Sequence, residues 1–235
     1  MFSGGLRLDS PSFFLFLMVS AYWLAVYIRA RSKISLVNPQ VITVVIVIGY
    51  LQALDVPFEK YEPAGNLLSY WLQPAVVCLA LPLYRQWRRI GSQLGPVLIS
   101  QLAGSLVGIV SGVYLALLFG ASPAVSAALA TKSVTMPIAI EVTQAYGGIV
   151  PVAALAVIIA GLTGQLGGLW LMRRVVRRPM SLAVAEGTAS HAMGIARCLE
   201  ISQKYASYAT VGLIFNGILT SFIAPYLVPL LLPLT

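Results

Sequence analysis

The chain has 235 residues, of which 59% are hydrophobic and only 9% are charged, and its mean hydropathy is +0.88. A soluble domain is about 45–50% apolar and about 25% charged, so this composition excludes a water-soluble enzyme and indicates a protein that lies mostly in a membrane. The net charge is +8, but the cations fall in short clusters between apolar runs, as in the cytoplasmic loops of multispanning membrane proteins. The charge therefore does not predict a nucleic-acid partner.

Apolar runs of membrane-spanning length follow one another along the chain. A bilayer core needs about 20 apolar residues per helix, and six runs approach that length: Phe13–Ile28, Pro39–Leu54, Leu67–Tyr84, Leu94–Phe119, Ile149–Met172 and Ala206–Leu232. Two further stretches, residues 122–147 and 181–203, are as long but are interrupted by small and polar residues. We predict an all-α polytopic membrane protein with about 6–8 transmembrane segments, two of them broken or re-entrant. The whole chain, residues 1–235, is expected to form a single integral membrane domain.

Basic clusters orient these runs, because short cytoplasmic loops carry an excess of Lys and Arg. The arginines after the first and third runs place those ends in the cytoplasm, and an acidic loop at residues 55–62 then lies outside. If residues 122–147 crossed the membrane fully, the arginines between 173 and 178 would lie outside. A segment that enters from the outside and returns keeps them inside. Non-helical backbone at membrane depth needs protein or a water-filled cavity around it, so the charge pattern predicts a cavity-lining element here.

Small residues recur every four positions in two of the runs, at Gly104, Gly108 and Gly112 and at Ala160, Gly164 and Gly168. This spacing lets helix backbones approach closely in lipid. The shared pattern fits either an internal, inverted repeat, as in many transporter folds, or independent use of glycine for close packing. A further broken helix is a candidate at residues 67–84, where two prolines remove backbone donors.

Residues 130–137 carry a lysine, three hydroxyl side chains and a proline in an otherwise apolar stretch. Proline predicts that one helix ends and another begins here, at Pro137. The N-terminus of the new helix would attract an anion, together with the side chains of Lys132, Ser133 and Thr135. Charged residues at membrane depth are costly and are usually functional. Glu141 is expected either to couple protons or to pair with Lys132, and the alternative to a functional role is a structural Lys132–Glu141 pair that closes a kinked helix.

The segment 181–203 carries a second polar group, formed by Glu186, Thr188, Ser190, His191 and Arg197. Ser, Thr and Gly supply turn and capping chemistry before a short helix. His191 is the only histidine in the chain. Because imidazole titrates near neutral pH, it is suited to carboxylate binding or proton relay; the alternative is a structural histidine. The scattered acids lack a metal-ligand spacing, so no metal site is predicted.

Three ordered motifs resemble those of the LrgB/CidB family of membrane proteins. Residues 131–141 (TKSVTMPIAIE), followed by Gly147-Gly148-Ile149, match the first; residues 186–197 (EGTASHAMGIAR) match the second; and residues 79–84 (LALPLY) match the third. The similarity covers almost the whole chain. Met136 stands where threonine is common in the family, which leaves the following proline in place.

The resemblance implies two functions from different classes, both in the bacterial inner membrane. Bacterial members are discussed as holin-like or antiholin-like proteins that modulate murein hydrolase activity and lysis, usually beside a smaller membrane protein of the LrgA/CidA type. A plant plastid member is a glycolate/glycerate transporter, and bacterial members are linked to pyruvate movement. The common ligand of these transporters is a small carboxylate.

We therefore expect a secondary transporter of small 2-hydroxy or 2-oxo monocarboxylates, with the holin/antiholin-like function as the alternative. The expected substrate-binding residues are Lys132, Ser133, Thr135, Pro137, Thr188, Ser190, His191 and Arg197. Glu141 and Glu186 would tune charge or couple transport to H⁺ or Na⁺. No cofactor and no enzymatic activity are expected, because no nucleophile–base pair is visible. Expected partners are the carboxylate, membrane lipid, further copies of the chain and an LrgA/CidA-type protein.

Overall fold

The computed structural model describes residues 10–32, 38–71 and 94–232, together with the isolated positions 74, 77, 78, 81, 84 and 91. Within these residues the backbone is helical apart from turns and short connections, and no strand occurs. Four helical stretches of this described part are long and apolar enough to cross a membrane: Pro11–Ser32, Leu94–Leu118, Val150–Met172 and Gln203–Leu231. The predicted all-α polytopic membrane fold is thus confirmed. The chain divides into two compact units, residues 1–75 and 76–235; the single membrane domain and the inverted repeat stay predictions.

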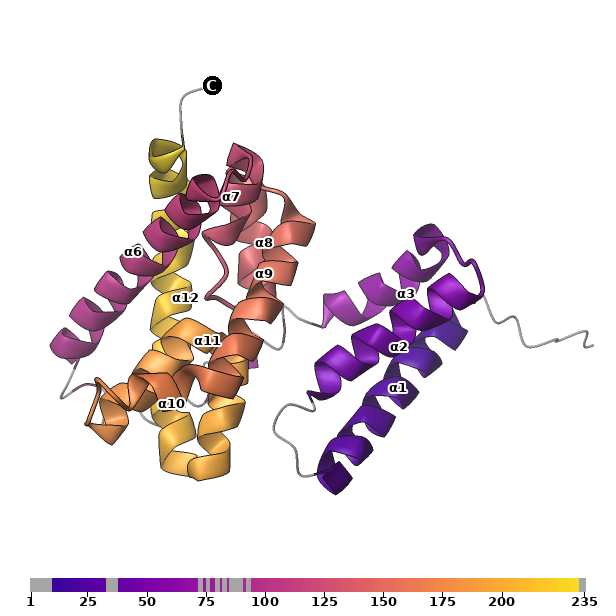
Figure 1. The fold of residues 1–235 in the computed structure, drawn as a ribbon, viewed down its shortest axis with the longest axis horizontal. Helices are drawn as coiled ribbons and strands as arrows, with labels where there is room; N and C mark the ends of the chain where they lie inside the picture. Colours follow the sequence, from indigo (N-terminus) through magenta and orange to yellow (C-terminus); the bar gives the residue numbers. More distant parts are fainter. Residues whose placement is uncertain are drawn as a thin grey trace, which may run out of the picture. The chain divides into compact units, whose positions relative to one another are not determined.

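The first unit packs three helices around a small apolar core (Figure 1). These helices are α1 (Pro11–Ser32), α2 (Pro39–Ala53) and α3 (Phe58–Tyr70). Phe14 and Ala64 are fully buried between them, with Met18 and Val47 beside them. The Asn38 side chain accepts a hydrogen bond from the Gln40 amide at 2.8 Å, which caps the start of α2.

Helix α3 occupies a stretch for which the sequence predicted an outer loop. Glu59, Lys60 and Glu62 lie on this helix, so the loop expected at residues 55–62 is wrong over most of its length. Pro57 has an extended backbone and is the N-cap residue of α3, so the helix begins directly after it. Glu59 lies in the first turn of α3, where a negative charge is favourable. Eight of the 18 residues of the expected third span, residues 67–84, lie outside the described residues, and so does most of the break expected there.

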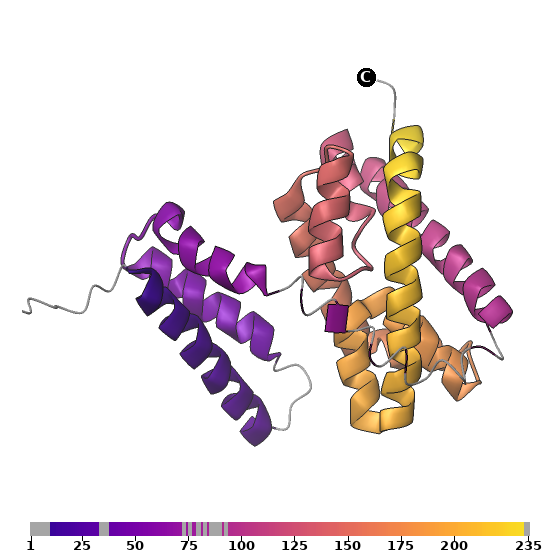
Figure 2. The same ribbon diagram turned by 180° about the vertical axis from the view of Figure 1, so that it is seen from behind.

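The second unit contains the remaining helices, and Figures 1 and 2 show α12 passing alongside α8 and α11. Their bounds are α6 (Leu94–Leu118), α7 (Pro123–Leu129), α8 (Met136–Ala145), α9 (Val150–Thr163), the π-helix η1 (Gly164–Gly168), α10 (Leu169–Met172), α11 (Pro179–Ile201) and α12 (Gln203–Leu231). The backbones of α11 and α12 touch directly. A Cβ atom at Gly187 would lie 1.9 Å from the Ala209 carbonyl oxygen, and one at Gly212 would lie 2.2 Å from that of Val184. Glycine is therefore required for this helix pair to close.

The first predicted break is confirmed by the non-helical residues 130–135, which separate α7 from α8. The two short helices run antiparallel. Thr131 Oγ1 lies 2.8 Å from Thr143 Oγ1, and the Tyr146 hydroxyl donates to the Ala127 carbonyl at 3.2 Å. The segment is therefore a hairpin whose two ends lie together, as a re-entrant element requires.

The second predicted break is confirmed at His191, which interrupts α11. Its φ of 44° and ψ of −135° are not helical. Such a conformation costs a non-glycine residue about 1–3 kcal/mol and persists only where the surroundings hold it. Here the ring Nε2 lies 2.8 Å from the Val157 carbonyl oxygen of α9. His191 thus divides α11 into two helical halves and fixes the division against a neighbouring helix.

Candidate functional site

Asn216, near the middle of α12, joins the two broken segments. Its Nδ2 donates to the carbonyl oxygen of Ser133 at 2.9 Å and to that of Thr188 at 3.2 Å. Its Oδ1 accepts a hydrogen bond from Ser105 Oγ of α6 at 2.7 Å. One buried amide therefore holds the first broken segment, the second broken segment and α6 in a single arrangement.

Lys132 lies at the tip of the α7–α8 hairpin and reaches α6. Its Nζ donates to the Gly108 carbonyl oxygen at 2.6 Å. Gly108 lies near the middle of a helix of membrane-spanning length, so the ammonium group is placed far from both ends of that helix. Glu141 is exposed on α8, and among the described residues no ion pair joins it to Lys132. The expected Lys132–Glu141 pair is therefore not formed.

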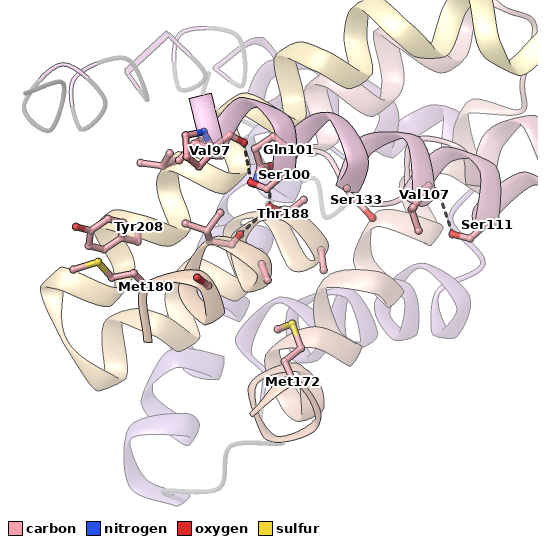
Figure 3. Close-up of a pocket in the computed structure, with 18 of the residues that line it drawn as sticks. Val97, Ser100, Gln101, Val107, Ser111, Ser133, Met172, Met180, Thr188 and Tyr208 are labelled. Atoms are coloured by element: carbon pink, nitrogen blue, oxygen red, sulfur yellow. Dashed lines mark hydrogen bonds between the residues drawn. The ribbon is translucent and has the colours of Figure 1, made fainter. Parts of the chain in front are cut away.

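Lys132 and Ser133 line a cavity of about 720 Å³ between the hairpin tip, α6, α11 and α12, which we call the first hollow (Figure 3). Thr188 of α11 and Gln101 of α6 also line it, and the Thr188 hydroxyl donates to Gln101 Oε1 at 2.9 Å. Ser100 adds a further hydroxyl from α6. The first hollow thus offers one cation, several hydroxyls and an amide on otherwise apolar walls, which is the set of groups that a small polar anion needs.

Lys132 also lines a second hollow, of about 570 Å³, on the α9 side of the hairpin. This second hollow is lined mainly by apolar residues of α9 and α10, together with Gly164 and Gly168 of η1 and Ser190 of α11. Lys132, Met172 and Ala189 are common to both hollows. The Lys132 side chain therefore lies between the first and the second hollow and lines both of them.

The two ladders of small residues face the broken segments. On α6, a Cβ atom at Gly104 would lie 3.2 Å from Thr188 Cγ2, and one at Gly112 would lie 2.6 Å from the Leu129 carbonyl oxygen. Close packing is thus found at two of the three predicted glycines of α6, whereas a Cβ atom at Gly108 would meet nothing within 4 Å. On α9, Gly161 faces α11 together with Gly164 and Gly168, while Ala160 lines the second hollow beside the same two glycines.

The α9 ladder makes room for three polar side chains of α11. Cβ atoms at Gly161, Gly164 and Gly168 would lie 2.5 Å from His191 Cε1, 1.6 Å from Ser190 Oγ and 2.5 Å from Glu186 Oε2 respectively. Each glycine therefore seats one of the polar side chains that the sequence singled out.

The predicted site residues separate into three groups. Lys132, Ser133 and Thr188 line the first hollow, and Ser190 lines the second. Glu186 and His191 are buried beside the α9 ladder. The remaining predicted residues line neither hollow: Thr135, Pro137, Glu141 and Arg197. Arg197 instead pairs with Glu200 on the partly exposed side of α11.

Gln101, Ser105 and Asn216 belong to the site but were not predicted. Gln101 is the only amide side chain in α6 and Asn216 the only asparagine in α12. A lone buried amide in an apolar, membrane-length helix was a usable signal, because polar side chains there bond across helices. Within the described part of the chain, no group of three His, Cys, Asp or Glu side chains is placed to hold a metal ion.

Comparison with known proteins shows one family and several full-length relatives. A family model described as the LrgB-like family matches residues 18–230. An uncharacterized protein of Haemophilus influenzae is 35% identical over 219 residues, 93% of this chain and 95% of the relative. YxaC of Bacillus subtilis, also an uncharacterized protein, is 33% identical over 215 residues, 91% of this chain and 94% of its own. An antiholin-like protein LrgB of Bacillus mycoides is 28% identical over 222 residues, 94% of this chain and 96% of its own. No solved structure gives a significant match.

Proposed function

The chain belongs to the LrgB-like family, and on that premise we propose that it is a secondary transporter of small 2-hydroxy and 2-oxo monocarboxylates in the bacterial inner membrane. The observation that carries the proposal is the position of Lys132. Its ammonium group lies at the tip of a broken-helix hairpin, near the middle of α6, between two hollows. Charged residues at this depth usually mark substrate pathways, and secondary transporters build their sites from discontinuous helices.

The groups of the first hollow fit one carboxylate with a neighbouring oxygen. Lys132 would bind the carboxylate after leaving the Gly108 carbonyl. Ser133, Thr188 and Gln101 would bond the 2-hydroxy or 2-oxo group. The first hollow is larger than such an acid, so its apolar part would serve as the route of entry, and Ser190 would meet the substrate in the second hollow.

The other predicted residues would act indirectly. Pro137 lies in the first turn of α8 and favours the start of that helix. Thr135 is the N-cap residue that precedes α8. His191 would serve as the hinge of α11, and Glu141, Glu186 and Arg197 would set the charge around the path. Lipid surrounds the helices, and assembly into a homo-oligomer is part of the proposal.

The antiholin-like function is the second candidate, and the names of the relatives favour it. Bacillus proteins that match over nearly their whole length are named antiholin-like protein LrgB. A protein of that kind would modulate murein hydrolase activity and lysis, with an LrgA/CidA-type protein as partner. A regulator or pore former needs assembly and a polar helix face. It does not need a lysine held between two broken helices, which is why the geometry supports the carrier.

Uptake by proteoliposomes of the full-length chain tests the proposal. Vesicles are given radiolabelled glycolate, glycerate or pyruvate under a proton or a sodium gradient, and a trapped fluorescent dye reports leakage. A carrier accumulates at least one acid, shows counterflow and retains the dye. Dye release together with non-selective flux would favour the second candidate. The absence of uptake of every acid under both gradients would refute the transporter proposal.

A further inference from the structure

Glu186 is a carboxyl group sealed inside the second unit. Its side chain is 0% exposed, which makes it the only buried Asp, Glu, Lys or Arg of the described residues. Within residues 94–232 neither carboxyl oxygen has a hydrogen-bond partner. A buried polar group without a partner is costly and is rare in folded proteins. Its presence in α11, next to a helix break, therefore needs a functional explanation.

The π-helix η1 provides a tight seat for this carboxyl. A Cβ atom at Gly168 would lie 2.5 Å from Glu186 Oε2 and 3.1 Å from Oε1. At the neighbouring Gly167, a Cβ atom would meet nothing within 4 Å. The carboxyl thus fills the space over Gly168 and lies against the backbone of η1. Single π-turns within α-helices are frequent at functional sites.

Among the described residues, no cation forms an ion pair with Glu186. On its own helix, the Ser190 hydroxyl lies near the carboxyl without forming a hydrogen bond of good geometry, and the Arg197 guanidinium and the Cys198 thiol interact with it electrostatically. Arg197 is bonded to Glu200 and is 37% exposed. An ionised carboxylate buried in this way would be far more costly than the neutral acid.

Within residues 94–232, the elements packed against this part of α11 bring no further carboxylate and no basic side chain that pairs with Glu186. The glycine ladder of α9 and η1 completes the seat, and on α11 itself the His191 ring is already bonded to the Val157 carbonyl oxygen of α9. From α12, the residues packed against this part of α11 are alanines, with two tyrosines at the edge of the cluster: Ala206, Ala209, Tyr205 and Tyr208. From the hairpin, Lys132 lines the same hollow as Ser190. The seat therefore suits a protonated carboxyl.

We propose that Glu186 is the proton-binding site of the carrier: it holds one proton while seated on Gly168 and releases it when α11 moves away from η1. This inference rests on the proposed function and selects the proton, not sodium, as the coupling ion. Coupling Na⁺ ions are coordinated by oxygen atoms such as freed backbone carbonyls, whereas the Glu186 carboxyl lies against the Cβ position of Gly168 and no other described side chain bonds to it. On release, the O–H bond of the carboxyl breaks, its electron pair stays on Glu186, and the proton passes to water in the hollow.

The surrounding geometry links this step to substrate binding. The second hollow is lined by Gly164, Gly168 and Ser190 at one side and by Lys132 at the other. His191 supplies the break in α11 beside the seat. A proton on Glu186 and a carboxylate on Lys132 add no net charge to the membrane interior. The two would therefore cross together at a lower electrostatic cost than either alone.

The test uses the full-length chain in proteoliposomes with Glu186→Gln, an uncharged mimic of the protonated acid. We expect accumulation under a proton gradient to fall to the equilibrium level while counterflow exchange continues. A sodium gradient should drive no accumulation in the wild type. The matched control is Glu62→Gln, an exposed glutamate of α3, which should accumulate substrate like the wild type. Accumulation by Glu186→Gln, or sodium-driven accumulation by the wild type, would overturn the proposal.

Two further measurements keep the proposal testable if Glu186→Gln folds poorly. Infrared difference spectra of the wild type should contain the band of a protonated carboxyl, and this band should be shifted in Glu186→Asp and in Gly168→Ala, where the seat is altered. Gly167→Ala should keep both the band and the proton-driven uptake. The absence of the band in the wild type would refute the proton site. If the wild type transports no acid at all, the proposed function fails, and the infrared band alone then decides whether Glu186 holds a proton.

Discussion

Asn216 and Ser133 are 83 residues apart in the chain and are joined by a hydrogen bond of 2.9 Å. The same amide group also donates to the Thr188 carbonyl, so α12 holds both broken segments through one side chain. Buried carbonyl groups freed by helix breaks need partners, and Asn216 supplies a partner to one in each segment. It therefore sets the distance between the hairpin tip and α11, and with it the shape of the first hollow.

Replacement of Asn216 by leucine should destabilise the second unit and impair uptake. Leucine has a similar size, but it would leave two carbonyl groups and the Ser105 hydroxyl without their partner. We expect a loss of about 3 kcal/mol, since each unsatisfied buried group costs about 1–3 kcal/mol. The readout is the thermal unfolding midpoint in detergent, measured together with uptake. The control is Ser221→Ala, whose hydroxyl bonds only to Gly217 of its own helix at 2.8 Å. Equal midpoints for the two variants would show that Asn216 does not tie the segments together.

Replacement of Lys132 by methionine should abolish carboxylate uptake and leave the protein folded. Methionine fills similar space, and removing a charge from membrane depth does not cost stability. We expect substrate affinity to fall more than about tenfold, which is about 1.4 kcal/mol of binding free energy. Binding and uptake of labelled acid in proteoliposomes provide the measurement.

Lys204 offers a matched control for that charge change, because it is an exposed lysine at the start of α12. Lys204→Met should transport like the wild type. Lys132→Arg, which keeps the charge but enlarges the head group, should retain weak binding. Undiminished uptake by Lys132→Met would remove the main support for a carboxylate site at the hairpin tip.

Gly187→Ala should destabilise the α11–α12 pair, since its Cβ would lie 1.9 Å from the Ala209 carbonyl oxygen. That oxygen belongs to the backbone and cannot move without shifting a helix. Overpacking of this kind typically costs about 1–3 kcal/mol. Gly167→Ala, with no atom within 4 Å of the new Cβ, should be neutral or slightly stabilising. Thermal unfolding of both variants in detergent measures the difference, and a similar midpoint for the two would contradict the direct contact of α11 with α12.

The sequence predicted both broken segments, but it could not predict what joins them. Charge counting and Pro137 located the first break, since membrane topology and proline chemistry are local signals. Asn216 was missed because its partners lie far away in the chain. The α9 ladder was expected at Ala160, Gly164 and Gly168, but the regular four-residue spacing did not reveal that Gly161 also faces α11, against His191. Glu141 was expected beside Lys132 from sequence proximity, but the α8 helix turns it outward.

At position 191 we predict that the glycine variant is more stable than the alanine variant, which is the reverse of the usual order in a helix. In a regular helix, glycine is less stable than alanine by about 1 kcal/mol. At φ 44° and ψ −135°, alanine keeps the strain of His191, whereas glycine adopts such conformations readily. Both His191→Ala and His191→Gly lose the bond to the Val157 carbonyl, so their difference reports the backbone alone. We therefore expect His191→Gly to be more stable than His191→Ala by about 1 kcal/mol.

The neighbouring position Ala189 provides the reference for this comparison, because it is exposed and lies within the helical part of α11. Ala189→Gly should lower the thermal unfolding midpoint in detergent, as expected of a regular helix. At position 191, by contrast, the midpoint of His191→Gly should be higher than that of His191→Ala. A hinge that depends on this conformation should also bend more readily with glycine, which would raise the rate of counterflow relative to His191→Ala. If alanine is instead the more stable residue at position 191, α11 is continuous in the folded protein and His191 cannot serve as its hinge.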